Sequence, residues 1–230
     1  MRVREGQALA VIRHNARSLL SCERVILNLM QHLSGIATLT RRYADELQGT
    51  KARVLDTRKT VPGLRALDKY AVLCGGGTNH RLDLSDGILI KNNHIALGGG
   101  IKAVLGAALS GRKPGQRVEI EVRTLQDLEE ALKYGAEAVL LDKMTPDLAK
   151  AAVARIKAAE KERRELFPAA DGEKQAWIPI EASGGIVLET IREYALAGVD
   201  FISVGALTHS AGAADISMRI VADTSAGAQG

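Results

Sequence analysis

Residues 53–60 read RVLDTRKT and residues 87–94 read GILIKNNH, so two short apolar runs are each followed at once by basic and polar side chains. Between them, residues 75–81 read GGGTNHR. In parallel α/β proteins the reacting groups lie just past the carboxyl ends of the strands. We therefore expect five basic side chains to line one pocket: Arg58, Lys59, His80, Arg81 and Lys91. Such a pocket suits a strongly anionic small molecule.

A basic cluster alone is weak evidence for a site, because lysine and arginine are usually solvated surface residues. The informative feature is where these clusters lie in the chain. A solvated charge has no need to follow a strand, whereas a ligand-binding charge in a parallel sheet does.

Strand-like and helix-like patterns alternate along most of the chain. Six runs have the character of strands: 53–56, 87–91, 117–122, 137–142, 177–182 and 200–204. Amphipathic helical patterns cover 124–134, 146–166 and 187–197. This alternation predicts parallel strands joined by right-handed crossovers, in either a doubly wound sheet or a barrel. The strands are too few for a complete barrel, so we predict an α/β fold of the incomplete (β/α) TIM-like barrel type.

The N-terminal part of the chain does not fit this alternation. Residues 1–20 contain a turn at Gly6 and a strand-like run over 8–12, too little material to bury both faces of a strand. We interpret them as the end of a domain whose beginning is absent. Residues 21–50 carry apolar side chains at helical spacing and are predicted to form one long helix, bent at Gly35.

Length and composition allow one main domain. The chain has 230 residues, of which 46% are hydrophobic, and this is enough for a full core. We assign the barrel to residues 51–220 and a flexible tail to residues 221–230. The charged stretch 160–174 breaks the alternation and is predicted to form a helix end followed by a solvent-exposed loop.

Charge and cysteine content exclude several functions. The chain has 31 basic and 27 acidic residues, a net charge of +4 and only 3% aromatic residues, so no nucleic acid partner is expected. Cys22 and Cys74 have no metal-type spacing and predict reduced thiols. The first 20 residues alternate charged and apolar side chains, without the uninterrupted apolar core of a signal peptide, and no apolar run of about 18 residues occurs. We therefore expect a soluble protein of the cytoplasm, or of the nucleus, with no membrane partner.

Carboxylates complement the basic pocket. Residues 118–122 read VEIEV, and the next strand ends in Asp142. Because strand side chains alternate, Glu119 and Glu121 share a face, and Glu121 lies nearer the end where chemistry is expected. A carboxylate that points into a barrel is costly unless it has a use. Structural roles stay open at this point, with Glu119 at the rim of the sheet and Asp142 as the cap of the next helix.

Two glycine-containing loops have phosphate-binding character. Residues 181–186 read EASGGI and residues 203–210 read SVGALTHS, each at the end of a predicted strand. Glycine lets backbone N–H groups approach phosphate oxygens, and the start of the following helix supplies a positive dipole. Strand-to-helix turns often need glycine for their own sake, but two such loops late in a barrel predict a phosphate monoester ligand.

The predicted pocket thus combines a phosphate-binding end, two carboxylates and several cations. This set suits transfer of a phosphoribosyl group from phosphoribosyl pyrophosphate. The loops would hold its 5′-phosphate, the carboxylates its ribose hydroxyls and magnesium, and the cations the pyrophosphate that leaves. The transition state is cationic at the anomeric carbon, so nearby carboxylates stabilise it.

Short motifs occur in a fixed order along the chain: RKT at 58–60, NHR at 79–81, LIKNNH at 89–94, EIEV at 119–122, LD at 141–142, SGG at 183–185 and VGALT at 204–208. Others precede them: ARSLL at 16–20, ER at 23–24, LN at 27–28 and LSGIAT at 33–38. Over nearly the whole chain this set resembles the quinolinate phosphoribosyltransferase family, the carboxylating nicotinate-nucleotide pyrophosphorylases. The resemblance implies a type II phosphoribosyltransferase barrel, with residues 1–20 as the remnant of an N-terminal α/β sandwich domain.

The resemblance also implies a role for each basic residue of the pocket. The residues implied to hold the two carboxylates of quinolinate are Arg58, His80, Arg81 and Lys91. Lys59 and Lys91 would meet the pyrophosphate. Arg24 would reach the quinolinate site of a neighbouring subunit, so the helix over 21–50 is implied to contribute to a homodimer with shared active sites, or to a hexamer built from such dimers.

For the other ligand groups, the resemblance implies that Glu121 and Asp142 contact the ribose hydroxyls and Mg²⁺. Together with Lys59 they are the implied catalytic residues. The residues implied to hold the 5′-phosphate are Ser183, Gly184, Gly185, Gly205, Ala206 and His209. The implied reaction joins quinolinate nitrogen to the ribose carbon, releases pyrophosphate and then carbon dioxide, and leaves nicotinate mononucleotide in the synthesis of NAD.

Two alternatives have support in the sequence. A related phosphoribosyltransferase that acts on another pyridine, or on a molybdenum-linked substrate, would keep the same phosphate loops, although the four quinolinate-binding cations favour a dicarboxylate. An inactive truncated subunit that dimerises or binds ligand without turnover is favoured by the shortness of segment 1–20.

Overall fold

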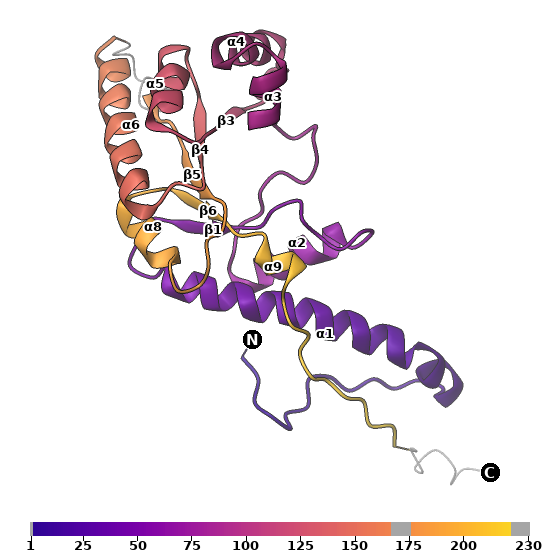
Figure 1. The fold of residues 1–230 in the computed structure, drawn as a ribbon. Coiled ribbons are helices and arrows are strands. Elements are labelled where there is room, and N and C mark those ends of the chain that lie inside the picture. The colour runs from indigo at the N-terminus through magenta and orange to yellow at the C-terminus, as the bar shows by residue number, and fades with distance from the viewer. Residues whose placement is uncertain (1, 167–175, 222–230) are drawn as a thin grey trace, which may run out of the picture.

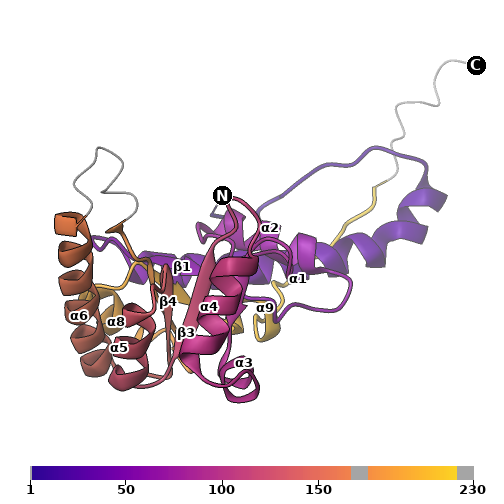
Figure 2. The same ribbon diagram turned by 90° about the horizontal axis from the view of Figure 1, so that it is seen from above.

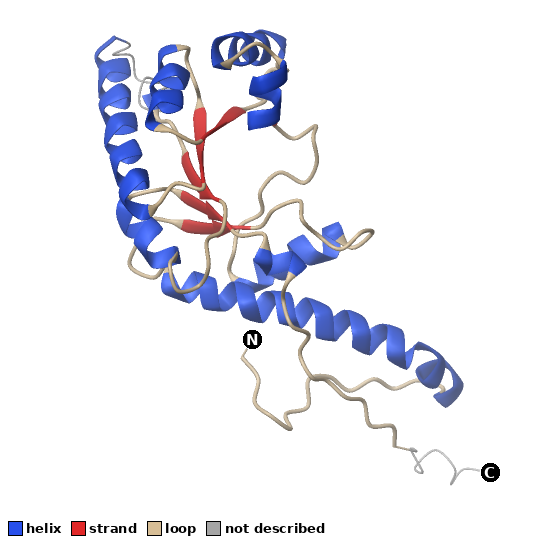
Figure 3. Cartoon of the chain, viewed as in Figure 1, coloured by secondary structure: helices blue, strands red, loops and turns tan. Residues whose placement is uncertain are grey.

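The strands of this protein form one curved parallel sheet. The computed structural model describes residues 2–166 and 176–221, and the strands within them are β1 (Arg53–Leu55), β2 (Ile88–Ile90), β3 (Val118–Val122), β4 (Ala138–Asp142), β5 (Ile180–Ser183) and β6 (Phe201–Ser203). They lie in the order β1-β6-β5-β4-β3-β2, and every neighbouring pair is parallel. Figure 3 shows these strands as an open arc. The predicted α/β fold and its strands are confirmed, with small shifts at the strand ends.

The two faces of the sheet differ in chemistry. Val118, Ile120 and Val122 of β3 are fully buried in the core that the helices cover. Glu119 and Glu121 lie between them and therefore face the concave side of the arc. Alternation of this kind leaves an apolar convex face and a polar interior.

Helices cover the convex face of the arc, as Figure 1 shows. The helices within the described residues are α1 (Ala16–Glu46), α2 (Arg65–Gly75), α3 (Asn92–Leu97), α4 (Ile101–Gly111), α5 (Leu125–Lys133), α6 (Pro146–Leu166), α8 (Ile191–Ala197) and α9 (Ala206–His209), of which the short α3 and α9 lie at strand ends. The core between helices and sheet includes Leu128 of α5, Ile156 of α6 and Ile191 of α8, all fully buried.

Local sequence signals explain several helix boundaries. α5 begins with a capping box, in which the Thr124 hydroxyl accepts a bond from the Asp127 N–H at 3.0 Å and the Asp127 carboxylate accepts one from the Thr124 N–H at 3.1 Å. α6 begins at Pro146, a residue that suits the first turn of a helix. Both helices were predicted, whereas α2, α3 and α4 were not. α2 buries Asp68 and Lys69, which hides its amphipathic pattern.

The N-terminal region differs from the prediction in two respects. The strand expected over 8–12 is absent, and these described residues form an extended coil in which Val11 is 83% exposed. Without a neighbouring strand, its backbone groups have no ladder to join. The long helix begins at Ala16 rather than at residue 21, because the Asn15 side chain caps it by accepting a bond from the Arg17 N–H at 2.9 Å.

α1 continues through Gly35 without interruption. The glycine is needed there for another reason: a Cβ at this position would lie 2.1 Å from the carbonyl oxygen of Gly212. The segment after α9 therefore crosses α1 at this point. The crossing is fixed by bonds from the Ala214 N–H to the Gln31 carbonyl at 2.9 Å and from the Gln31 side chain to the Ile216 carbonyl at 2.7 Å.

The N-terminal half of α1 projects from the body of the molecule, as Figures 1 and 2 show. The C-terminal half of this helix packs on α2 and α9, whereas Leu20 and Val25 near its start are more than half exposed. Within residues 2–166 and 176–221, no helix combines the length and apolar character needed to cross a membrane. Of the predicted loop over 160–174 and tail over 221–230, residues 167–174 and 222–230 lie outside the described residues.

Candidate functional site

The loops after β1 and β6 meet at the carboxyl end of the sheet. The Thr208 hydroxyl donates to the Lys59 carbonyl at 2.8 Å. A Cβ on Gly205 would lie 2.9 Å from Cδ of Lys59 and 3.2 Å from the ring of His209. The structure therefore places Lys59 beside the second predicted phosphate loop, of which Gly205, Ala206 and His209 are part.

The first predicted phosphate loop, residues 181–186, lies beside the end of β4. Asp142 pairs in register with Ser183, and Ser183 with Ser203, so the two phosphate loops leave neighbouring strands. Gly184 has a φ of 97°, and a Cβ there would lie 3.0 Å from Oδ1 of Asp142. Only glycine suits both this left-handed conformation and this close approach.

Lys143 lies beside the predicted site residues, and the sequence patterns did not single it out. Its φ is 56°, and among the described residues it is the one non-glycine residue with a positive φ. Its N–H donates to the Ser183 carbonyl at 2.8 Å, which ties β4 to the first phosphate loop. Strained residues of this kind concentrate at functional sites. Its position directly after Asp142 at a strand end was the available signal.

The two predicted carboxylates lie on adjacent strands and have basic or amide partners. Glu121 accepts a bond from the Asn92 side chain and lies 3.7 Å from Nζ of Lys91. Asp142 accepts a bond from Nε of Arg123 at 2.9 Å. Asn92 and Arg123 are further residues that the sequence reasoning missed, although Asn92 lies within the motif at 89–94.

Arg58 and Arg81, in the segments that follow β1 and precede β2, are close enough for their charges to interact. Burial, and then the charge of Arg58, lower the pKa of the Arg81 guanidinium. Arg81 donates through Nη1 to the carbonyl of Gly87 at 2.8 Å. Two neighbouring guanidinium groups repel each other, so a bound anion would relieve this repulsion.

His80 is held at all four of its hydrogen-bonding groups. Its backbone N–H donates to Oδ1 of Asp56 at 2.9 Å, and its carbonyl accepts from Nζ of Lys69 at 2.9 Å. On the ring, Nδ1 accepts from the Arg81 N–H at 2.7 Å. Nε2 lies 3.2 Å from Oε2 of Glu181 and 3.6 Å from Oε2 of Glu119.

The cluster of His80, Glu119 and Glu181 retains protons strongly. Burial opposes charge on the ring, but hydrogen bonds to the two carboxylates and their charge outweigh it and raise the pKa of His80 to about 10. Burial and the charge of Glu181 raise the pKa of Glu119. Glu119 is therefore an interior residue and not a rim residue, and Glu181 is a partner that the sequence reasoning missed.

A buried polar network supports these loops from below. Lys69 forms a fully buried ion pair with Asp56, the residue at the end of β1. His32 of α1 bonds Oδ1 of Asp68 through Nε2 at 2.7 Å, and Oδ2 of Asp68 accepts from the Val61 N–H at 3.0 Å. Asp68 thus connects the long helix to the loop that carries Arg58 and Lys59.

Arg24 does not join the other predicted site residues within the chain. Its side chain is 80% exposed on the projecting half of α1, and its one ion pair among the described residues is with the adjacent Glu23 at 3.7 Å. The remaining predicted residues lie within the last residues of a strand, directly after a strand, or after the Thr78 bridge that extends the sheet beyond Leu55.

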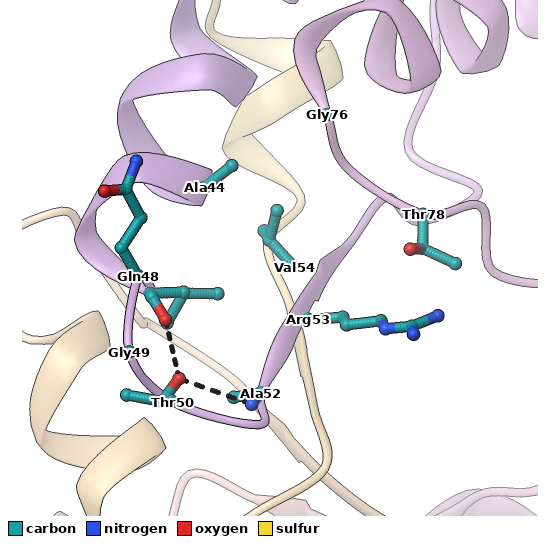
Figure 4. A pocket seen from close by; sticks show the side chains of 10 residues that line it. Ala44, Gln48, Gly49, Thr50, Ala52, Arg53, Val54, Gly76 and Thr78 are labelled. Carbon is teal, nitrogen blue, oxygen red and sulfur yellow. Dashed lines mark hydrogen bonds between the residues drawn. The ribbon is translucent and has the colours of Figure 1, made fainter.

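A hollow of about 330 Å³ lies at the opposite end of β1 and is drawn in Figure 4. Its wall includes Gln48 and Thr50 of the loop before β1, where the Thr50 hydroxyl donates to the Leu47 carbonyl at 2.8 Å. Arg53 supplies the charge of this wall. None of the predicted site residues lines it, so we place the candidate site at the carboxyl ends of the strands.

Comparisons with known proteins match the chain along most of its length. The family model "Quinolinate phosphoribosyl transferase, C-terminal domain" matches residues 36–219, and its N-terminal counterpart matches residues 1–34. The chain is 43% identical to the carboxylating nicotinate-nucleotide pyrophosphorylase of Mycobacterium leprae, covering 95% of this chain and 72% of that protein. It is 40% identical to the decarboxylating quinolinate phosphoribosyltransferase 1b of Nicotiana tabacum, covering 95% of this chain and 62% of that protein.

Solved structures agree with these matches. The crystal structure of NadC from Streptococcus pyogenes has a TM-score of 0.77 at 40% identity and covers 90% of this chain and 66% of that one. The nicotinate-nucleotide pyrophosphorylase of Ehrlichia chaffeensis has a TM-score of 0.76 at 40% identity and covers 86% and 66%. The chain thus spans about two-thirds of the length of the relatives that it matches.

Proposed function

This chain belongs to the quinolinate phosphoribosyltransferase family, and we propose that it transfers the phosphoribosyl group of phosphoribosyl pyrophosphate to quinolinate, with loss of carbon dioxide. The products are nicotinate mononucleotide and pyrophosphate. The observation that carries the proposal is the shared location of two glycine loops, two carboxylates and several cations at the carboxyl ends of six parallel strands.

The proposed substrate contacts follow from the charges of these groups. The glycine loops after β5 and β6 bind the 5′-phosphate through backbone N–H groups, with Ser183 and His209 beside them. Arg58 and Arg81 bind the carboxylates of quinolinate, since a guanidinium fork matches a carboxylate. Lys59 and Lys91 bind the pyrophosphate as it leaves. Because the dicarboxylate and the leaving group are both anions, several cations are needed in one opening.

The chemistry requires mainly positioning and charge stabilisation. Glu121 and Asp142 face the ribose, whose anomeric carbon becomes cationic in the transition state. Once the ring nitrogen is joined to ribose, its positive charge stabilises the carbanion left by carbon dioxide. The protein groups therefore hold the two reactants in line and neutralise the charge that moves.

A magnesium ion fits the same carboxylates, because Mg²⁺ prefers carboxylate oxygens and retains several waters. Glu121 and Asp142 are the residues that would hold it, in exchange for their present contacts with Lys91 and Arg123. When bound, the ion would neutralise negative charge on the pyrophosphate.

We further propose that two copies of the chain associate through α1. The exposed apolar side chains Leu20 and Val25 on the projecting half of this helix suit burial against a second copy. Such an arrangement would allow Arg24 to serve the partner's site, as the family resemblance implies. Within one chain, Arg24 does not lie with the other predicted site residues at the carboxyl ends of the strands.

Release of labelled carbon dioxide from quinolinate tests the function. We expect release to depend on phosphoribosyl pyrophosphate and Mg²⁺, and nicotinate in place of quinolinate to give no product. Lys59→Ala and Arg81→Ala should each lose about thirtyfold or more of kcat/KM, because each removes a charge-assisted contact. Unchanged circular dichroism would show that both variants fold. Full activity in either folded variant would contradict the assignment.

A further inference from the structure

Each glycine loop of the site has a lysine side chain packed against its glycine. At the second loop, a Cβ on Gly205 would lie 2.9 Å from Cδ of Lys59. At the first loop, a Cβ on Gly184 would lie 2.6 Å from Cγ of Lys143. The same Cβ would lie 3.0 Å from Oδ1 of Asp142, so the stem of Lys143 and this carboxylate meet on one side of the loop. The two loops are thus matched, each with a cation of its own.

The backbone around Lys143 is fixed on both sides. The Lys143 N–H donates to the Ser183 carbonyl at 2.8 Å. The next residue, Met144, is buried, and its carbonyl accepts a bond from the Tyr194 hydroxyl at 2.9 Å. In a regular strand, Lys143 would point to the face opposite Asp142. Its φ of 56° ends the strand instead, and its stem lies against the glycine of the loop.

Lysine is an unfavourable residue for this backbone conformation. A left-handed φ suits glycine, and asparagine tolerates it better than most residues with a side chain. A turn needed only for the path of the chain would therefore favour either of these residues. Lys143 is also exposed and forms no ion pair with the carboxylates of residues 2–166 and 176–221, whereas the adjacent Asp142 pairs with Arg123. Neither the turn nor a salt bridge explains the lysine, but an anion bound at the loop does.

We propose that Lys143 is a further substrate-binding residue, whose ammonium group contacts the 5′-phosphate of phosphoribosyl pyrophosphate at the loop over 181–186. The inference rests on the proposed function for the identity of this ligand. Lysine binds phosphate as a compact point charge, and the side chain beyond Cγ is long enough to place that charge at the loop. Lys59 and Lys143 then neutralise different phosphates of one substrate, the leaving pyrophosphate and the 5′-phosphate.

Substitutions at position 143 separate the charge from the backbone conformation. Lys143→Asn removes the charge and suits the left-handed φ, whereas Lys143→Arg keeps the charge. The probe is nicotinate mononucleotide, which carries the 5′-phosphate and no pyrophosphate. By titration calorimetry we expect its Kd to rise about tenfold or more in the Asn variant and to stay within about threefold in the Arg variant. The Kd for quinolinate should stay unchanged in both.

Lys150→Gln is the matched control. It removes one positive charge from an exposed lysine of α6 and should leave the Kd for nicotinate mononucleotide unchanged. This control shows whether a general change in net charge, and not a contact at the loop, weakens the binding of an anion.

Thermal unfolding gives a readout that a purely structural role would move in the opposite direction. Lys143→Asn relieves an unfavourable backbone conformation, so its Tm without ligand should be equal to or higher than that of the unaltered chain. The rise in Tm on adding nicotinate mononucleotide should shrink, because binding is weaker. Lys143→Gly is a second charge-free variant that suits the same φ, and it should behave in the same way.

Several results would overturn the proposal. An unchanged Kd for nicotinate mononucleotide in folded Lys143→Asn would assign the residue to the turn alone. The same result with a raised KM for phosphoribosyl pyrophosphate would assign the charge to the pyrophosphate. Equal weakening in Lys150→Gln would reduce the effect to net charge.

Ribose 5-phosphate distinguishes failure of this inference from failure of the proposed function. If the unaltered chain binds ribose 5-phosphate but releases no carbon dioxide from quinolinate, the proposed function fails. Weaker binding of ribose 5-phosphate by Lys143→Asn would still assign the phosphate contact to Lys143, and equal binding would contradict it. A chain that binds neither ribose 5-phosphate nor nicotinate mononucleotide would contradict both.

Discussion

At the scale of single residues, Glu121 and Asp142 are the groups whose charge should matter most to the rate. In the proposed reaction their carboxylates stabilise a cation that exists only in the transition state. We expect Glu121→Gln and Asp142→Asn each to lower kcat by about a hundredfold and to change the KM for quinolinate much less. Steady-state kinetics against both substrates measures this division, and an effect confined to the KM for quinolinate would contradict the role.

The cluster around His80 should make stability depend on pH. The two carboxylates raise the pKa of His80 to about 10, above its value of about 6.5 in the unfolded chain. The cluster therefore contributes stability that is fully present below about pH 6.5 and is lost as the pH rises toward about 10, by at most about 1.4 kcal/mol per pH unit.

Chemical denaturation across this range would measure the slope. Glu181→Gln removes one of the two charges that raise the pKa of His80, so its free energy of unfolding should fall less steeply with pH. Glu129→Gln should keep the slope of the unaltered protein, because this exposed glutamate of α5 pairs with Arg155 and has no part in the pKa of His80. Identical slopes in all three proteins would show that the cluster does not retain its proton.

At the scale of the elements, two helical glycines should respond in opposite directions to the same substitution. Alanine is favoured over glycine in a helix by about 1 kcal/mol. A Cβ on Gly106 of α4 would have no atom within 4 Å, so Gly106→Ala should stabilise the protein. Gly35→Ala should destabilise it, because the new methyl group would meet the backbone of Gly212. Thermal unfolding of both variants measures the contrast. A stabilised Gly35→Ala would show that the segment after α9 moves away from α1 at no cost in stability.

The strands and some of the helices were predictable from the sequence, whereas other helices were not. Strand positions were predictable because apolar runs alternate with helical patterns, and the helices over 124–134 and 146–166 carry clear start signals. α2 and α4 were missed for different reasons. α2 buries polar residues that usually lie at the surface, and α4 is apolar on most of its circumference.

The candidate site likewise has a part that the sequence predicts and a part that it does not. The residues that follow strands, such as Lys59, Asp142 and the glycine loops, could be predicted because a parallel sheet brings its strand ends together. The surroundings of His80 could not, because they depend on Glu119 and Glu181 converging on its ring from β3 and β5, and on Lys69 of α2 reaching its carbonyl. Lys69 reads as a surface residue in the sequence, and only the fold buries it against Asp56.

At the scale of the whole molecule, the position of Arg24 predicts complementation between inactive chains. We expect Arg24→Ala and Lys59→Ala each to lose nearly all activity alone, because each removes a charge from every site. Mixed chains should recover about a quarter of full activity, since half of randomly formed dimers are mixed and one of their two sites is intact. Failure of recovery, with mass spectrometry showing the mixed dimer, would return Arg24 to a surface role.

The pairing of β1 with β6 has a consequence for how the protein is made. Arg53 of β1 pairs with Phe201 of β6. The first strand of the described sheet therefore cannot form its hydrogen bonds with β6 until the last strand has been made. During synthesis on the ribosome, β1 is exposed as a free edge while the strands between are added, and such edges invite association with other chains. Pairing between distant segments also slows folding. Pulsed hydrogen exchange should therefore find the amides of β1 and β6 protected together and last, after those of β3 and β4.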